Sequence, residues 1–310
     1  MLICFSGTGN TALAATRLAR ALGDDQLLPL TPDLLLHPSR TILRPETTAD
    51  GCPARVIWAF PTHSWGIPPV FVDFLRNVGM SAEMQKARHY MLTTCGDDMA
   101  YTDRQWRREM HARGLNPVAA YAVQMPNTYV CMKGFDVDSP EVANAKLAAL
   151  PAAIEKIVGS IRNGGPDILL RKHFSWIKSA IIYPWFKKHA ITAKPFHTTS
   201  ACISCGRCAA ACPLRNITMT SPAATNAETV PVNPTDATGI HAETAPGDPS
   251  DAGGNPEKST PTWGDRCALC LRCYHLCPTH AIAYGTATLH KGQYRAPSGY
   301  APDASQSIKS

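Results

Sequence analysis

Two cysteine runs near the C-terminal end decide the fold of this chain: Cys202-x-x-Cys205-x-x-Cys208-x-x-x-Cys212-Pro213 and Cys267-x-x-Cys270-x-x-Cys273-x-x-x-Cys277-Pro278. The spacing is identical in the two runs, including the proline after the fourth cysteine. Closely spaced thiolates of this kind are typical of metal-binding segments. The duplication indicates that the two runs form one structural unit.

This spacing is typical of segments that hold 4Fe-4S clusters, in which three cysteines of one run bind one cluster and the fourth binds the cluster of the other run. The expected ligands are, for cluster I, Cys202, Cys205, Cys208 and Cys277, and, for cluster II, Cys267, Cys270, Cys273 and Cys212. Neither run can then complete a cluster alone.

A zinc site and a disulfide framework are the alternatives for paired Cys-x-x-Cys motifs. Zinc takes four ligands and would leave four thiols unused, and no cluster of histidine ligands accompanies the runs. Disulfides are typical of secreted proteins, whereas the sequence opens on an apolar strand pattern from which we expect no signal peptide. The spacing therefore favours iron–sulfur clusters.

The composition predicts a soluble protein of two domains. With 310 residues, 45% hydrophobic and 17% charged, the chain can bury a substantial core. The apolar run 180–186 is far shorter than the ~20 residues of a membrane span. Twelve cysteines predict a reducing cytoplasm, and oxygen-sensitive clusters favour an anaerobic one.

The net charge of +6 is unevenly distributed. Residues 221–260 contain six acids and one lysine, whereas residues 151–200 contain eight Lys or Arg and two acids. Such a basic segment is either a solvated face or a docking surface for an acidic redox partner protein. No nucleic-acid reading motif accompanies it, so we expect no nucleic-acid partner.

A polar glycine loop, Ser6-Gly7-Thr8-Gly9-Asn10-Thr11, lies between an expected strand at 2–5 and an expected helix at 12–22. Glycines let backbone N–H groups turn inward, hydroxyls add donors, and the helix N-terminus favours negative charge. No Gly-Lys pair follows, and Ala12 stands where a dinucleotide fingerprint has its third glycine. The loop therefore predicts a site for a single phosphate monoester.

The first half of the chain predicts an α/β fold with a doubly wound, five-stranded parallel sheet. The further expected strands are 26–30, 55–60, 90–94 and 119–123, with helices at 69–77, 102–113 and 140–163. Right-handed crossovers place helices on both faces. In the strand order 2-1-3-4-5 the switch point brings the glycine loop beside residues 61–66.

A flavin ring fits between the loops after the first, third and fourth expected strands. The expected contacts are Ser6, Gly7, Thr8, Gly9, Asn10, Thr11, Pro61, Thr62, Trp65, Gly66, Thr94, Cys95 and Gly96. Trp65 either stacks on the ring or packs in the loop. Cys95 is either a filler or a flavin neighbour, and the sequence leaves the distance of His63 from a flavin open.

These segments resemble a known family. Residues 5–11, 60–68, 125–129 and 292–295, with the two cysteine runs, are similar to bacterial and archaeal ferredoxins that carry an N-terminal flavodoxin-like domain. The resemblance implies a flavodoxin-like fold with FMN, a small α+β ferredoxin-type domain with two 4Fe-4S clusters, and electron transfer. It assigns no catalytic residue and implies an electron carrier rather than an enzyme with a defined substrate.

The expected domains are a flavodoxin-like FMN-binding domain at 1–165, a basic aromatic connector at 166–194, a two-cluster ferredoxin domain at 195–295 and a loose tail at 296–310. Within the connector, 171–189 either packs Phe174, Trp176, Ile177 and Trp185 against both domains, which is favoured, or contacts a membrane surface. Residues 221–260 lack aromatics and predict a disordered insertion.

Three functions fit the sequence. The favoured one is electron transfer between two 4Fe-4S clusters and FMN. A flavin-dependent reductase of a small organic substrate would need a general acid near Trp65 and a substrate cavity. A redox sensor or carrier with an empty flavodoxin-like domain would retain no flavin on purification.

Overall fold

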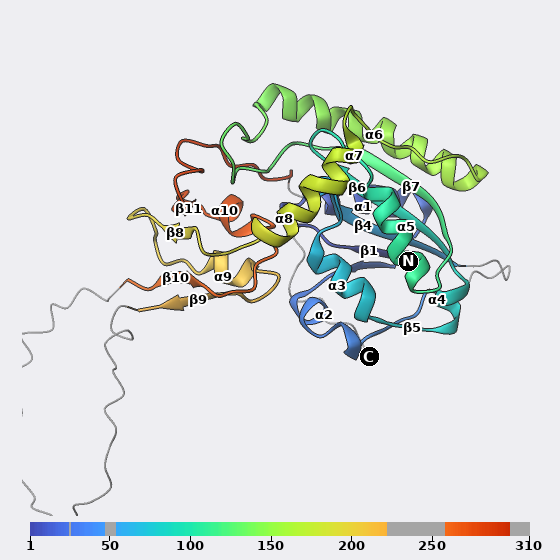
Figure 1. Ribbon diagram of the computed structural model, residues 1–310, viewed down its shortest axis with the longest axis horizontal. Coiled ribbons are helices and arrows are strands. Elements are labelled where there is room, and N and C mark those ends of the chain that lie inside the picture. Colours follow the sequence, from blue (N-terminus) through green and yellow to red (C-terminus); the bar gives the residue numbers. More distant parts are fainter. Residues whose placement is uncertain (25, 47–53, 222–257, 298–310) are drawn as a thin grey trace, which may run out of the picture.

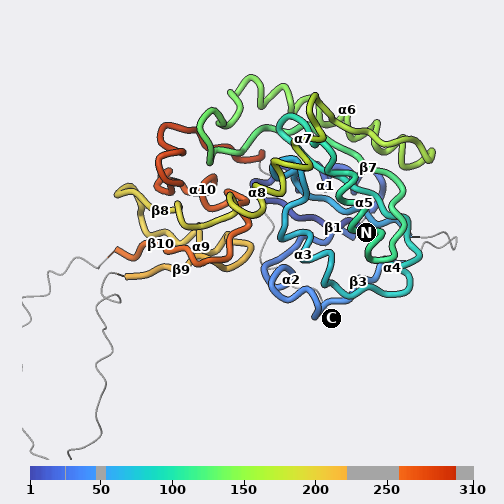
Figure 2. The backbone as a smooth tube through the Cα atoms, in the orientation of Figure 1, coloured from blue at the N-terminus to red at the C-terminus, as the bar shows by residue number. Residues whose placement is uncertain are grey.

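The computed structural model describes residues 1–24, 26–46, 54–221 and 258–297. Figure 1 shows a parallel sheet with helices on both faces and, beside it, a smaller part built from short strands and helices. The tube in Figure 2 shows that α10 of the smaller part lies toward the sheet and that β9 and β10 lie away from it. Most of the insertion and tail expected at 221–260 and 296–310 lies outside the described residues.

The sheet has the predicted architecture. Its five parallel strands are, in spatial order, β2 (Leu27–Pro29), β1 (Leu2–Cys4), β4 (Arg55–Pro61), β6 (Arg88–Cys95) and β7 (Pro117–Gln124). In chain order these are the five expected strands in the order 2-1-3-4-5, so the predicted fold class is confirmed. The carboxyl ends of all five strands meet at one edge, where ligands bind in this architecture.

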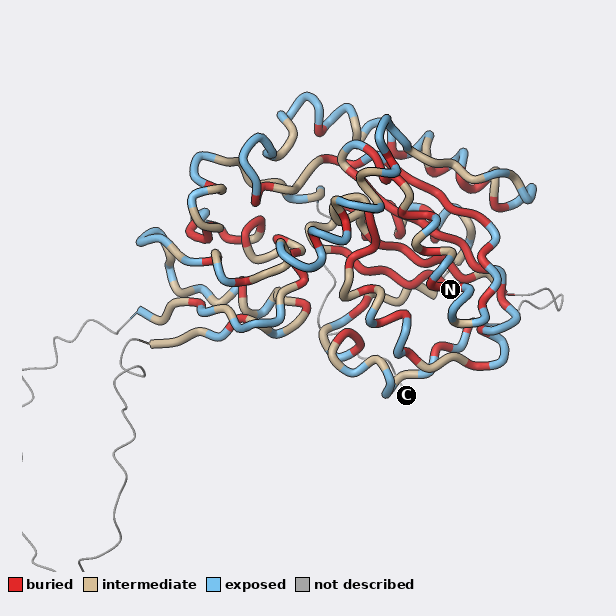
Figure 3. Tube along the Cα trace, in the orientation of Figure 1, coloured by how far each residue is buried: buried red, intermediate tan, exposed pale blue. Residues whose placement is uncertain are grey.

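Two apolar cores hold the helices to the sheet. Helices α1 (Asn10–Leu22) and α6 (Pro140–Asn163) pack on one face. Helices α3 (Pro69–Asn77) and α5 (Thr102–Ala112) pack on the other. Figure 3 shows the strands between them as mostly buried, apart from the edge strand β2, whose residues are half-buried. Apolar residues alternate between the two faces along each strand, which is why both sides of the sheet need cover.

Several short elements were not predicted. They are α2 (Pro32–Leu36), the 3₁₀ helix η1 (Pro38–Arg40), β3 (Ile42–Leu43), β5 (Gly79–Met80) and α4 (Ala82–Lys86). None is long enough to show a hydrophobic period. The Thr31 and Ser81 hydroxyls cap α2 and α4 by accepting hydrogen bonds from Leu34 N and Met84 N.

The smaller part consists of two antiparallel strand pairs and two short helices. β8 (Phe196–Thr198) pairs with β11 (Ile282–Tyr284), and β9 (Ile217–Thr220) pairs with β10 (Thr260–Trp263). The helices are α9 (Arg207–Ala211) and α10 (Arg272–Leu276). Each strand pair joins a flank of one cysteine run to a flank of the other, so the runs form one unit.

The connector corrects one expectation. It is a continuous helical segment made of α7 (Ser175–Ile177), the π-helix η2 (Lys178–Ile182) and α8 (Tyr183–His189). Three of the four side chains expected to pack do not, because Phe174, Trp176 and Trp185 are 69%, 56% and 57% exposed.

Polar contacts anchor this segment instead. Lys178 Nζ pairs with the buried Asp98 at 2.6 Å, and the Tyr183 hydroxyl donates to the Ile67 carbonyl at 2.6 Å. A buried carboxylate needs a cation, which Lys178 supplies, and the aromatic residues of the connector that are buried are Tyr183 and Phe186. No helix in the described part of the chain is long and apolar enough to cross a membrane.

Candidate functional site

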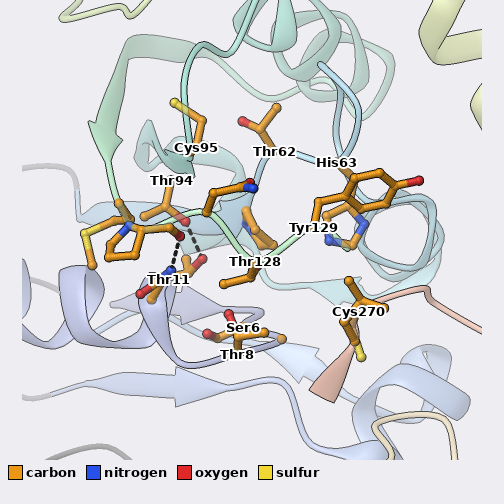
Figure 4. A pocket seen from close by; sticks show the side chains of 18 of the residues that line it. Ser6, Thr8, Thr11, Thr62, His63, Thr94, Cys95, Thr128, Tyr129 and Cys270 are labelled. Carbon is orange, nitrogen blue, oxygen red and sulfur yellow. Dashed lines mark hydrogen bonds between the residues drawn. The ribbon is translucent and has the colours of Figure 1, made fainter. Parts of the chain in front are cut away.

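An open cavity of about 700 Å³ lies at the carboxyl edge of the sheet. Its wall combines the loops that follow β1, β4, β6 and β7 with part of the second cysteine run. The lining residues that matter below are Ser6, Gly7, Thr8, Thr62, His63, Thr94, Cys95, Tyr129 and Cys270. Figure 4 shows the labelled residues arranged around one space.

The glycine loop has the form of an anion cradle. Gly9 has φ 101°, in the left-handed region that favours glycine, and this turn starts α1. The backbone N–H groups of Gly7 and Thr8 have no hydrogen-bond partner within the described residues. Ser6 Oγ accepts from Ala12 N at 3.2 Å, which leaves its own proton free to donate. The loop thus offers donors to an anion at a helix N-terminus.

Three side chains that line the cavity also support the loop. The hydroxyls of Thr11 and Thr94 hydrogen-bond each other at 2.6 Å, which ties the first turn of α1 to β6 (Figure 4). Asn10 Nδ2 donates to the Pro126 carbonyl at 2.8 Å. These contacts hold the loop against the ends of the neighbouring strands.

His63 lies in the cavity wall near Tyr129 (Figure 4). Its Nδ1 is buried and has no hydrogen-bond partner among the described residues. Burial lowers the pKa of His63 to about 4, so the ring is neutral at pH 7. A neutral imidazole with an unpartnered nitrogen in a cavity is suited to a hydrogen bond with a ligand.

Most residues predicted to bind the cofactor do line this cavity. They are Ser6, Gly7, Thr8, Asn10, Thr11, Pro61, Thr62, Thr94, Cys95 and Gly96. Gly9, Trp65 and Gly66 lie outside the lining. Trp65 Nε1 donates to Asp98 Oδ2 at 3.3 Å, and a Cβ on Gly66 would lie 2.3 Å from the Tyr183 ring. Both residues therefore face the connector.

Other lining residues were not predicted. His63 was noted but not placed, and Tyr129, Phe186 and residues 269–271 were not assigned to the site. Tyr129 follows the fifth strand of the sheet, and its place at that strand's carboxyl end was the available signal. No local pattern points from the cysteine run to the cavity.

Two smaller cavities lie within the cysteine runs. One, of about 350 Å³, is lined by Cys212, Cys267, Cys270 and Cys273. The other, of about 330 Å³, is lined by Cys202, Cys205, Cys208 and Cys277. Each cavity thus brings together three cysteines of one run and the fourth cysteine of the other.

The backbone conformation also recurs in the two runs, with positive φ angles at equivalent positions 65 residues apart. Ser204 and Leu269 have φ 56° and 47°, and Arg215 and His280 have φ 47° and 54°. The two crossing cysteines have matching partners, because Asn216 N donates to Cys212 Sγ at 3.3 Å and Ala281 N donates to Cys277 Sγ at 3.2 Å. Backbone donors to sulfur are one means by which proteins set the potential of iron–sulfur clusters.

The cysteines would have to lose their protons to bind iron. Burial raises the pKa of Cys267 to about 12 and that of Cys273 well above its usual value, and a cationic cluster iron would offset the cost of ionising them. In the described part of the chain, no three His, Cys, Asp or Glu side chains are arranged around one metal ion. A 4Fe-4S cluster differs from such a site in that each thiolate binds its own iron.

Comparisons with known proteins agree with this chemistry. Residues 201–282 match the family model described as a 4Fe-4S dicluster domain. This part of the chain is a ferredoxin-type module, and the match supports an iron–sulfur electron carrier. No curated protein matches the chain.

Among solved structures, "The Structure of Trp Repressor Binding Protein from Bacillus subtilis" is 16% identical. The alignment covers 50% of this chain and 94% of that one, with a TM-score of 0.32.

Proposed function

We propose that this protein transfers electrons between two 4Fe-4S clusters and one FMN bound in the large cavity. The observation that carries the proposal is that Cys270 lines both the large cavity and the adjacent cysteine cavity. A flavin in the large cavity and a cluster in the cysteine cavity would therefore lie on opposite sides of Cys270. FMN can take one or two electrons and a cluster takes one, which would make the protein a converter between one-electron and two-electron partners.

The large cavity fits FMN at both ends. The free N–H groups of Gly7 and Thr8 with the Ser6 hydroxyl would hold the phosphate. His63 and Tyr129 offer a polar nitrogen and an aromatic ring at the side where Cys270 lies (Figure 4). These residues would hold the ring system against the ferredoxin module.

The other cysteine set would hold the outer cluster. Cys202, Cys205, Cys208 and Cys277 line a cavity that shares no lining residue with the large one. Cys205 is exposed, and the adjacent Ile203 is 55% exposed. We infer that a partner exchanges electrons here. The described residues 168–221 contain no Asp or Glu and eight Lys or Arg, which suits an acidic protein.

The test is cofactor analysis of the anaerobically purified protein. We expect iron and sulfide for two 4Fe-4S clusters, together with one FMN per chain. Two clusters without flavin, even after addition of FMN, would leave a ferredoxin-type carrier or sensor. Binding to anionic vesicles rather than to acidic proteins would assign the exposed aromatic face of 171–189 to a membrane surface.

A flavin-dependent reductase is the second candidate because His63 adds a titratable group to the cavity. The pKa of about 4 argues against it, since a neutral imidazole is a weak acid at pH 7. Turnover of an organic acceptor that disappears in His63→Asn, with flavin and clusters retained, would favour the reductase.

A further inference from the structure

Arg272, in the second cysteine run, reaches the glycine loop of the sheet. Its Nε donates to the Gly7 carbonyl at 2.8 Å, and its Nη2 donates to the Ser6 carbonyl. Its Nη1 donates to the Ala211 carbonyl at 3.3 Å. One guanidinium therefore binds two successive carbonyls of the loop and one carbonyl of the other cysteine run.

These hydrogen bonds determine where the loop's N–H groups point. In a trans peptide the C=O and the N–H lie on opposite sides. The peptides whose oxygens face Arg272 are Ser6–Gly7 and Gly7–Thr8. Their N–H groups, on Gly7 and Thr8, therefore point away from Arg272. These are the unpartnered donors of a loop that lines the large cavity.

The backbone of the second cysteine run also packs directly against the glycine loop. A Cβ on Gly7 would lie 2.6 Å from the Cys270 carbonyl oxygen, so the loop rests on this peptide without intervening space. Cys270 and Leu271 line the large cavity and also the cavity that Cys212, Cys267 and Cys273 share. The shape of the loop thus depends on the backbone that encloses the second cavity.

A second set of contacts joins the same two parts. The Tyr294 hydroxyl donates to Asn10 Oδ1 at 2.9 Å, and His275 Nε2 donates to the Thr128 carbonyl at 2.8 Å. His275 Nδ1 accepts from Tyr294 N at 3.2 Å, which leaves the Nε2 proton for Thr128. These bonds keep the module in place if Arg272 is changed.

The duplicated sequence supplies a matched position. Arg207 precedes Cys208 as Arg272 precedes Cys273. Arg207 is exposed, and its guanidinium has no hydrogen bond or ion pair within the described residues. The fold of a cysteine run therefore does not by itself give this arginine a hydrogen-bond partner. Arg272 has partners in the glycine loop because the second run packs against the sheet.

We propose that the phosphate site is shared between the two parts of the chain. Arg272 is a positioning residue that holds the glycine loop in its anion-binding conformation. Assembly of cluster II and binding of a phosphate-bearing flavin are therefore thermodynamically linked. The inference rests on the proposed function. Linkage is reciprocal, so loss of cluster II weakens FMN binding, and bound FMN stabilises cluster II by the same free energy.

The test compares FMN with riboflavin, which lacks the phosphate. We expect Arg272→Gln to weaken FMN binding at least tenfold while changing riboflavin binding little, with iron content retained. Arg207→Gln should bind both as the unaltered protein does. Equal loss for the two flavins, or no loss, would overturn the role of Arg272. If Arg272→Gln loses iron, Arg272→Lys, which keeps the charge but not the planar fork, is measured instead.

Hydrogen exchange separates this inference from the proposed function. Exchange at residues 6–11 should rise in Arg272→Gln and in Cys212→Ser, but not in Arg207→Gln or Cys202→Ser. This holds whether or not a flavin binds. If the unaltered protein binds no FMN but shows this pattern, the proposed function fails and the structural linkage stands. If exchange is the same in all four variants, the linkage is wrong.

Discussion

Gly7 and Cys270 are in direct contact although 263 positions apart in the chain. A Cβ on Gly7 would lie 2.6 Å from the Cys270 carbonyl oxygen and 3.2 Å from the Cys270 Cβ. Gly7 belongs to the anion cradle of the sheet, and Cys270 belongs to the second cysteine run. The two candidate cofactor sites therefore share a packing contact, and one substitution at this contact should affect both.

Gly7→Ala tests this contact. The clash is with backbone, which cannot rotate away as a side chain can, so we expect about 1–3 kcal/mol of destabilisation, weaker FMN binding and an altered cluster II spectrum. The control is Gly159→Ala in α6, where a Cβ meets nothing within 4 Å and alanine favours the helix. Normal FMN binding by Gly7→Ala would show that the two parts do not press together in solution.

The sheet could be predicted because each strand and long helix carries its own signal. The bounds expected for α6, residues 140–163, match the structure, since Ser139 and Pro140 mark its start and Gly164, in the left-handed region, marks its end. The cysteine spacing likewise predicted two sets of four, and the cavities assemble those same sets.

What could not be predicted depends on contacts between distant segments. Trp65 has the sequence signature of a ring-stacking residue, yet the buried Asp98 accepts its indole proton and orients it toward the connector. Phe174 and Trp176 were expected to pack but are exposed, and other side chains of the connector are buried in their place. The place of Cys270 in the large cavity arises only when the two parts dock.

Crossed ligation predicts which cysteine variants resemble each other. Cys212 lines the cavity of Cys267, Cys270 and Cys273, so Cys212→Ser should give the reduced-state paramagnetic spectrum of Cys267→Ser. It should differ from that of Cys202→Ser, although Cys202 lies in the same run. Spectra that group by run instead of by cavity would contradict the proposed ligand sets.

Removal of residues 222–257 should leave both clusters intact. Thr220 of β9 pairs with Thr260 of β10, so the chain ends left by the excision already lie side by side. Joining Ser221 to Lys258 would leave a loop of hairpin length between these strands. Iron content and the reduced-state spectrum check this expectation. Loss of iron would show that the excised segment supports or ligates a cluster.

His89 should make the sheet sensitive to acid. It is fully buried, accepts from Trp58 Nε1 at 3.1 Å and donates to the Met84 carbonyl at 3.0 Å, and burial lowers its pKa to about 4. Between about pH 6.5 and pH 4 the unfolded state binds more protons, so stability falls as pH falls, by up to about 1.4 kcal/mol per pH unit.

Urea unfolding between about pH 7.5 and about pH 5 measures this effect. His89→Gln should start less stable but lose less stability across that range. The exposed His111→Gln is the control and should follow the unaltered protein. Equal slopes for His89→Gln and the unaltered protein would mean that His89 is not held neutral in the folded state.

The final prediction concerns the route of electrons, and it follows from which cavities are adjacent. Of the two cysteine cavities in the described part of the chain, the one lined by Cys267, Cys270 and Cys273 shares lining residues with the large cavity, and the other does not. With FMN saturating and a low-potential one-electron donor, bleaching of the flavin should be independent of protein concentration, because both centres are in one chain. Cys202→Ser should keep this behaviour and Cys212→Ser should lose it, since only the latter removes the cluster next to Cys270. Bleaching that scales with protein concentration in the unaltered chain would mean that electrons pass between molecules.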